Sequence, residues 1–171
     1  MAVGYVKISE QADASGLSSV TLTGIDSTYD VYMVVYNNVR PTTNNKNMFY
    51  RITVGGVEDN TANYDQAGKV LRSTTPFSNT GYTNLTQITT DASLLNTLNV
   101  CTNNVLYLFN FPDAAEQSYV TYENVYSTSS MLGYMGGFCH TVQQAADGIK
   151  FYLESSDIFQ TGSFALYGLL K

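Results

Sequence analysis

Residues 48–54 read MFYRITV, a run with apolar side chains at Met48, Tyr50, Ile52 and Val54 and polar ones at Arg51 and Thr53. A period of two places successive side chains on opposite faces of a β-strand. An amphipathic helix would instead repeat its apolar positions every three or four residues, which this run does not do. It therefore predicts a strand with one face toward a core and the other toward solvent or a partner.

The same alternation recurs along most of the chain. It is clearest at Val20 and Leu22 and again over residues 105–111, and further strands are predicted at 29–39, 85–89, 118–126, 131–142, 148–154 and 163–170. About nine or ten short strands with turn signals between them are typical of an antiparallel β-sandwich, and we expect an all-β fold of the jelly-roll type.

Three local features refine this prediction. Residues 29–39 are apolar at both odd and even positions, which indicates a central strand buried on both faces. Gly55-Gly56 and Asp147-Gly148 are expected hairpin turns, because glycine accepts the positive φ that such turns need. The stretch 74–104 is expected to be mostly loop around the strand at 85–89, with Asp91 starting a short helical turn at 91–95.

Length and charge limit the classes of protein that fit. The 171 residues suit one β-sandwich domain over 1–171, and only 13% are charged, against about 25% in an average domain. The net charge is -6, and the eight Lys and Arg form no basic stripe, which argues against a nucleic-acid partner. Because a long apolar segment and a signal-peptide pattern are both missing, we expect a soluble protein that does not insert into membranes.

Cys101 and Cys139 are the only cysteines, too few for a disulfide scaffold and too far apart for a zinc ribbon. Both are flanked by apolar residues, at Val100 and Phe138, so buried free thiols are expected, with a disulfide between the two as the alternative.

Catalytic or metal-binding residues are not predicted. His140 is the single histidine, and its alternating context indicates a packed side chain of a sheet, while neighbouring Cys139 should point to the opposite face. Most Asp and Glu residues lie at expected turns, where capping explains them. The segments 58–60 and 113–116 could offer oxygen ligands to calcium, but they lack the EF-hand spacing. Phosphate-binding, dinucleotide, metalloprotease and serine-hydrolase motifs are missing, so we predict neither enzyme activity nor a cofactor.

The 14 tyrosines, with no tryptophan, are the most unusual feature of the composition. Tyrosine combines apolar area with one polar tip, so an excess suits either a partner-binding face or a sandwich core with tyrosine tips at its rim. A candidate face is formed by Tyr119, Tyr122 and Tyr126 with Asn124.

Both ends of the chain resemble a family of virion-surface proteins and tail-fibre domains of tailed bacteriophages. The first matching segment contains YDVY at 29–32, VRPT at 39–42, FYRI at 49–52 and Asn63-Tyr64. The second contains GIKF at 148–151, Ser155, Ile158 and GSFALYG at 162–168, with Ser156-Asp157 where the family pattern has Gly-Asn. The resemblance implies a jelly roll or related sandwich, often trimeric, located on a capsid surface or a tail, without catalytic residues.

We therefore expect a non-enzymatic virion structural protein, either a capsid decoration subunit or a tail or fibre component. It would act through protein–protein assembly, as a homotrimer and with other virion proteins, and could take part in host attachment. The alternative is a carbohydrate-binding module that recognises a host surface polysaccharide through loops at 60–65 or 82–86. A polysaccharide-degrading enzyme is a third hypothesis, and it would need two carboxyl groups about 5 to 9.5 Å apart in a groove.

Overall fold

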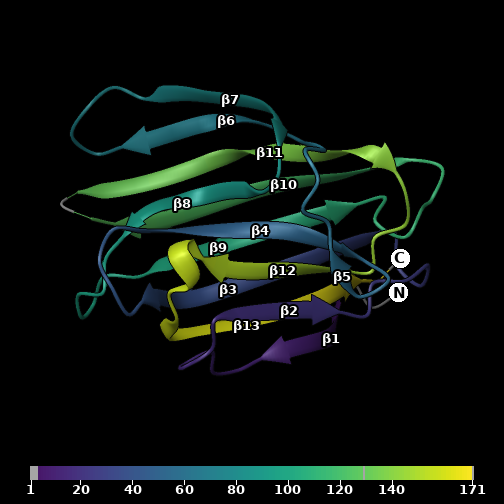
Figure 1. Ribbon diagram of the computed structural model, residues 1–171, viewed down its shortest axis with the longest axis horizontal. Coiled ribbons are helices and arrows are strands. Elements are labelled where there is room, and N and C mark those ends of the chain that lie inside the picture. The colour runs from purple at the N-terminus through teal and green to yellow at the C-terminus, as the bar shows by residue number, and fades with distance from the viewer. Residues whose placement is uncertain (1–3, 129, 171) are drawn as a thin grey trace.

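Two antiparallel β-sheets packed face to face form the computed structural model, which describes residues 4–128 and 130–170 (Figure 1). The fold is all-β, as predicted, and the described residues contain one helical segment, the short 3-10 turn Glu154–Ser156. The expected domain range of 1–171 also includes Met1, Ala2, Val3, Ser129 and Lys171, which lie outside the described residues.

The larger sheet has eight strands. In spatial order they are β1 (Tyr5–Gln11), β13 (Phe159–Leu169), β3 (Val31–Pro41), β9 (Thr102–Phe109), β10 (Gln117–Ser127), β11 (Met131–Gln143), β6 (Tyr64–Arg72) and β7 (Ser78–Leu85). All neighbouring pairs are antiparallel, and the ends of the chain meet where Tyr5 pairs with Leu169.

The smaller sheet lies in front of the larger one in Figure 1 and covers its inner face. Its strands are β2 (Ser19–Thr23), β12 (Gly148–Leu153), β4 (Lys46–Val54) and β5 (Val57–Glu58), and β8 (Ile88–Leu94) also pairs with β4. The predicted strands at 20–22, 48–54, 118–126 and 131–142 therefore exist close to their expected bounds.

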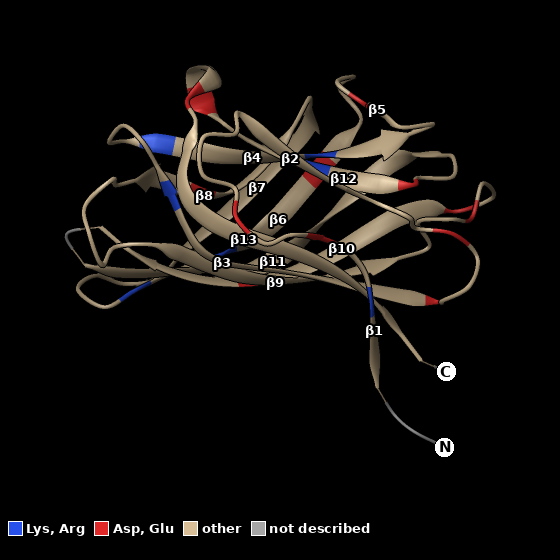
Figure 2. Ribbon diagram, turned by 90° about the horizontal axis from the view of Figure 1, so that it is seen from below, with Lys and Arg blue, Asp and Glu red and all other residues tan. Residues whose placement is uncertain are grey.

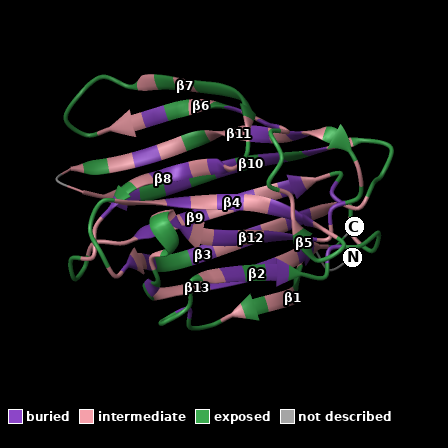
Figure 3. Cartoon of the chain, viewed as in Figure 1, coloured by how far each residue is buried: buried purple, intermediate pink, exposed green. Residues whose placement is uncertain are grey.

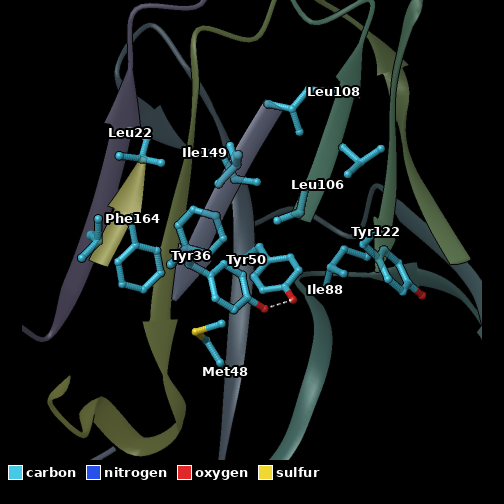
Figure 4. Packing of buried hydrophobic residues seen from close by; sticks show 14 of the residues in the cluster. Leu22, Tyr36, Met48, Tyr50, Ile88, Leu106, Leu108, Tyr122, Ile149 and Phe164 are labelled. Carbon is cyan, nitrogen blue, oxygen red and sulfur yellow. Dashed lines mark hydrogen bonds between the residues drawn. The ribbon is translucent and has the colours of Figure 1, made fainter. Parts of the chain in front are cut away.

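The core forms between the sheets from the inward residues of each strand. Along β3 and β9, buried residues alternate with half-buried ones, as the period of two requires (Figure 3). Tyr36 and Leu106 of the larger sheet pack toward Tyr50 and Ile149 of the smaller one (Figure 4). Burying each such side chain contributes roughly 1.5–3 kcal/mol to folding, so this packing supplies the main driving force for the sandwich.

A buried carboxyl group lies inside this core. Asp91 on β8 has no exposed surface, and its Oδ2 accepts hydrogen bonds from the hydroxyl groups of Tyr36, Tyr50 and Thr90, with a Tyr50 distance of 2.9 Å. Its Oδ1 accepts from Thr102 Oγ1 and from Asn124 Nδ2, the latter at 2.6 Å. Burial raises the pKa of Asp91, and these hydrogen bonds offset part of that rise.

Several local predictions were wrong. The described residues contain thirteen strands rather than nine or ten, because β1, β5, β6 and β7 were not expected and β8 replaces the helical turn at 91–95. The expected strand at 85–89 straddles the bend between β7 and β8. Asp147-Gly148 is not a hairpin turn, since it follows the crossing from β11 of one sheet to β12 of the other. Gly55 and Gly56, both with positive φ, do form the β4–β5 hairpin.

Candidate protein-binding surface

Among residues 4–128 and 130–170, no strand or helix covers the outer face of the larger sheet. On β3, Tyr32 is buried in the core while Val31, Met33 and Val35 point the other way and are only half-buried. Figure 2 shows the smaller sheet above the larger one and no strand layer beneath it. The prediction that this strand is buried on both faces is therefore wrong for its outer side, and its apolar residues lie on a sheet face without a second layer.

Side-chain size divides this outer face into two halves. One row of cross-strand partners runs across seven strands in the order Tyr167, Met33, Tyr107, Thr121, Gly137, Ala67 and Gly81. The first three residues, on β13, β3 and β9, form what we call the ridge. The last three, on β11, β6 and β7, form what we call the trough.

The trough is a hollow and not only a stripe of small residues. It has a volume of about 650 Å³ and is lined chiefly by apolar atoms, with Tyr82 and Tyr119 among the lining residues. These two tyrosines are 54% and 45% exposed, respectively. Tyr119 points outward beside the hollow, whereas Tyr82 pairs with the inward-facing Gln66. An exposed aromatic side chain such as Tyr119 is typical of protein interfaces.

Internal packing explains only part of the trough. A Cβ atom on Gly137 would lie 2.7 Å from the carbonyl oxygen of Val120, so the backbone itself requires glycine there. A Cβ atom on Gly81 would meet nothing within 4 Å, and Gly81 has an ordinary backbone conformation. Packing within the chain therefore does not require glycine at position 81, and the space above it is open to a partner.

Charges are sparse on this face, and its size suits an interface. A second row of partners reads Val35, Val105, Glu123, Met135 and Lys69, in which Met135 separates the two charged residues and the other two members are valines. Eight strands spaced about 4.8 Å apart give a width of about 34 Å, and eight residues per strand give a length of about 26 Å. The resulting area of about 900 Å² reaches the ~800 Å² that each partner buries in a standard interface.

The predicted tyrosine face is wrong in three of its four members. Tyr122, Asn124 and Tyr126 alternate along β10 on its core side and are buried, whereas Tyr119 has the opposite parity and is exposed. Tyrosines thus occur both in the core and on the outer face of the larger sheet. Tyr32, Tyr36, Tyr50 and Tyr64 are fully buried, while Tyr107, Tyr119 and Tyr167 line the outer face.

His140 is a packed core residue, as predicted. It has no exposed surface, its Nε2 lies 2.8 Å from Asp59 Oδ2, and its ring meets Tyr64 edge to face. Burial raises the pKa of Asp59, but hydrogen bonds from Thr61 and His140 outweigh that effect and leave the pKa below its usual value. The pair fastens the loop after β5 to β11, which gives the ring a structural role.

Both cysteines are free and half-buried, so neither the full burial that we expected nor the alternative disulfide is found. Cys139 faces the trough, opposite to His140 across β11, as the period of two predicts. Burial raises the pKa of the Cys139 thiol, which keeps it protonated near neutral pH.

The carboxyl groups mostly hold turns, as predicted. Asp26 Oδ1 accepts from the backbone N–H of Thr28 at 2.8 Å, and Asp113 Oδ1 accepts from that of Ala115 at 2.9 Å. Of the segments considered for calcium, Glu58 forms ion pairs with Arg51 and Lys150 at 3.0 Å. In the part of the chain that the structure describes, no three His, Cys, Asp or Glu side chains are grouped so that they could hold a metal ion.

The two segments considered as glycan-binding loops are partly strands, since residues 64–65 belong to β6 and residues 82–85 to β7, and these paired strands border the trough. Asp65 from the first and Tyr82 with Thr83 from the second line the same hollow. The sequence could not reveal this proximity, because it depends on the pairing of β6 with β7. No helix within residues 4–128 and 130–170 has the length and apolar character needed to cross a lipid bilayer.

Comparison of this chain with models of known protein families, with curated protein sequences and with solved structures found no match.

Proposed function

We propose that this chain is a non-enzymatic structural subunit of a tailed-bacteriophage virion and that it assembles through the outer face of its larger sheet. The observation that carries the proposal is the ridge and trough on one uncovered, charge-poor sheet face. Apolar area of this extent on one face of a soluble protein favours a role in protein–protein contact.

The strand order supports a jelly roll as the finer description of the sandwich. Each sheet contains a run of four neighbouring strands, β1-β13-β3-β9 in the larger sheet and β2-β12-β4-β8 in the smaller one. The chain crosses repeatedly from one of these runs to the other. Eight strands that alternate in this way follow the double Greek-key path of a jelly roll. The strands β6, β7, β10 and β11 then extend one sheet and create the trough.

The partners we propose are other copies of this chain, as a homotrimer, and neighbouring proteins of the virion surface, either on the capsid or on the tail. The ridge of one copy fits the trough of the next, and such head-to-tail contacts between different patches close into rings. Three copies around one axis would each use the ridge toward one neighbour and the trough toward the other, so each contact would take about half of the ~900 Å² face and would be smaller than a standard interface.

Light scattering coupled to gel filtration tests the assembly. The wild-type chain is expected at about 56 kDa, three times the 18.8 kDa of one chain. Met33→Lys, in the middle of the ridge, and Gly81→Phe, which fills the trough without an internal clash, are both expected to give monomers with unchanged melting temperatures. Thr21→Lys adds the same charge on the exposed side of β2 and should remain a trimer.

A wild-type monomer at ~100 µM would contradict self-assembly, and trimers formed equally well by Met33→Lys and Gly81→Phe would show that the contact lies elsewhere. A dimer would retain the surface and reject the threefold arrangement. Sedimentation of the tagged chain with assembled phage particles tests the virion location, and its absence from purified particles would contradict that part of the proposal.

A further inference from the structure

A second recess lies on the opposite side of the molecule, on the outer face of the smaller sheet. It has a volume of about 440 Å³, within the ~300–1,000 Å³ typical of small-molecule sites. Its lining includes Glu58 of β5 at one end and residues 154–156 of the 3-10 turn at the other. Figure 2 shows β5 and this turn on the side of β4 and β12 that faces away from the larger sheet, and residues of both line the recess, which we call the groove.

The floor of the groove is aromatic. Tyr152 of β12 pairs in register with Phe49 of β4, and their rings lie 5.6 Å apart at an angle of 47°. The guanidinium group of Arg51 lies over the Tyr152 ring, 5.0 Å from its centre. All three side chains point away from the core, because they alternate with buried residues on their strands.

The polar groups of the groove are held in place before any ligand arrives. Arg51 donates from Nε to the Thr86 carbonyl at 2.9 Å, from Nη1 to Glu58 at 3.0 Å and from Nη2 to the Gln87 side chain at 3.2 Å. The Tyr152 hydroxyl donates to the same Gln87 oxygen at 2.6 Å. Such fixed groups lower the entropy cost of binding a ligand.

Hydrogen-bonding capacity remains on both the donor and the acceptor side. A guanidinium group has five N–H bonds and an ammonium group has three. Arg51 therefore keeps two N–H donors, and Lys150, which donates to Glu58 at 3.0 Å, also keeps two. Ser155 and Ser156 line the groove, and their hydroxyl groups make no hydrogen bond within the described residues.

The net charge of the lining argues against an ionic ligand. Arg51 and Lys150 are balanced by Glu58 and Glu154, all of which line the groove. An anion would meet two carboxylates and a cation would meet two basic groups. An uncharged ligand rich in hydroxyl groups avoids both penalties and can use the free donors and acceptors together.

The wall of the groove stores backbone strain. Ser155 and Ser156 have φ of 58° and 56°, in the left-handed region that is sterically unfavourable for residues other than glycine. Ser156 occupies the position where the pattern of the phage family that this chain resembles has glycine, the residue that adopts this conformation without strain. Asp157 clamps the turn by accepting from Thr42 Oγ1 at 2.6 Å. Strained residues that persist at a cavity wall commonly contribute to binding.

We propose that this groove binds an uncharged saccharide, with a sugar ring packed on Phe49 and its hydroxyl groups bonded to Arg51, Lys150 and the two serines. Sugars present C–H groups on their ring faces and hydroxyl groups around their edges, which matches an aromatic floor within polar walls. The site is distinct from the assembly face and does not depend on the proposed assembly.

The wild-type chain should be tested on an array of neutral hexose and N-acetylhexosamine oligosaccharides printed beside uronate- and sialate-containing ones. We expect binding to neutral saccharides. The best neutral oligosaccharide then serves as the probe for calorimetric titration of variants. Phe49→Ala should weaken its affinity by about tenfold or more, because the stacking surface is lost.

The double variant Ser155→Gly/Ser156→Gly separates binding from folding. It relieves the left-handed strain, so the melting temperature should stay equal or rise while the affinity falls about three- to tenfold. Tyr119→Ala, on the outer face of the larger sheet, is the control and should bind the oligosaccharide like the wild type. The proposal is overturned if no neutral saccharide binds, if only anionic ones or a protein occupy the groove, or if Phe49→Ala and the serine variant bind like the wild type.

Discussion

Replacement of Asp91 tests the buried polar cluster of the core. Asp91→Ala removes the acceptor of five hydrogen bonds, from Tyr36, Tyr50, Thr90, Thr102 and Asn124. Each such bond contributes about 1 kcal/mol, and the Tyr36 and Tyr50 hydroxyl groups, 3.1 Å apart, can still bond to each other. The expected loss is about 4 kcal/mol, which lowers the melting temperature of a domain of this size by about 8–16 °C.

Below pH 3.8, where the carboxyl group of the wild type is neutral in both states, Asp91→Asn should cost much less, about 1 kcal/mol. With its Nδ2 turned toward Tyr36, Tyr50 and Thr90, the amide can donate to hydroxyl groups that reverse their own protons. The amide oxygen takes the place of Oδ1 of the native carboxyl group and still accepts hydrogen bonds from Thr102 and Asn124. Asparagine also imitates the neutral acid that burial favours at this position.

The dependence on pH follows from the raised pKa of Asp91. Below 3.8, its unfolded value, both states are protonated and the carboxyl group carries no penalty. As the pH rises from 3.8 to the folded pKa, the unfolded chain ionises first, and stability falls by about 1.4 kcal/mol per pH unit. The stability of the wild type relative to Asp91→Asn should therefore decline over this window and then level off.

Thermal unfolding followed by tyrosine circular dichroism, from pH 3.5 to pH 8, measures these differences. The reasoning fails if Asp91→Ala melts within about 3 °C of the wild type, which the lost bonds do not allow. It also fails if Asp91→Asn is as damaging as alanine, or if the difference between Asp91→Asn and the wild type does not change with pH.

Three further substitutions have defined outcomes. Gly136→Ala places a Cβ atom in steric clash with the Ala67 carbonyl oxygen, so the free energy of unfolding measured by urea titration should fall by about 3 kcal/mol. Gly81→Ala has open space around it and should stay within about 0.5 kcal/mol of the wild type. Ser156→Gly relieves a left-handed φ and should raise the unfolding free energy by about 0.5–1 kcal/mol in the same assay, and a loss would contradict the assigned strain. Burial raises the pKa of Asp157, but hydrogen bonds from Thr42 and Thr43 outweigh this effect and leave the pKa below its usual value. The wild type should therefore be more stable than Asp157→Asn at neutral pH, and this advantage should disappear as the pH falls below 3.8 through the folded pKa. An advantage that persists at about pH 2 would refute this prediction.

The sequence predicted best where alternation was strong. The strands at residues 48–54 and 118–126 could be predicted because each has one apolar face that is visible as alternation in the sequence. β7 was missed because its side chains are small, polar and mostly exposed, so nothing in SNTGYTNL distinguishes an edge strand from a loop. The sequence predicts a helical start at Asp91 instead of β8 because Asp is a common N-cap residue, although here its carboxyl group is buried among hydroxyl groups.

The candidate surfaces could not be predicted from local patterns. The trough depends on the register that aligns Gly137 of β11 with Ala67 and Gly81 of the consecutive strands β6 and β7, and β11 is far from these two strands along the chain. The groove likewise depends on Tyr152 meeting Phe49 across a pairing of residues about a hundred positions apart. The sequence did indicate the composition of these surfaces, because few charges and many tyrosines must leave some apolar area exposed.

The position of β13 governs how the protein can be made. This strand, residues 159–169, lies between β1 and β3, so the first strand of the chain has no neighbour in its sheet until the last one has left the ribosome. Until then β3 offers an unpaired apolar edge to other nascent chains, which is a hazard for aggregation. A chain cut short before residue 159 is therefore expected to be removed by proteolysis instead of accumulating.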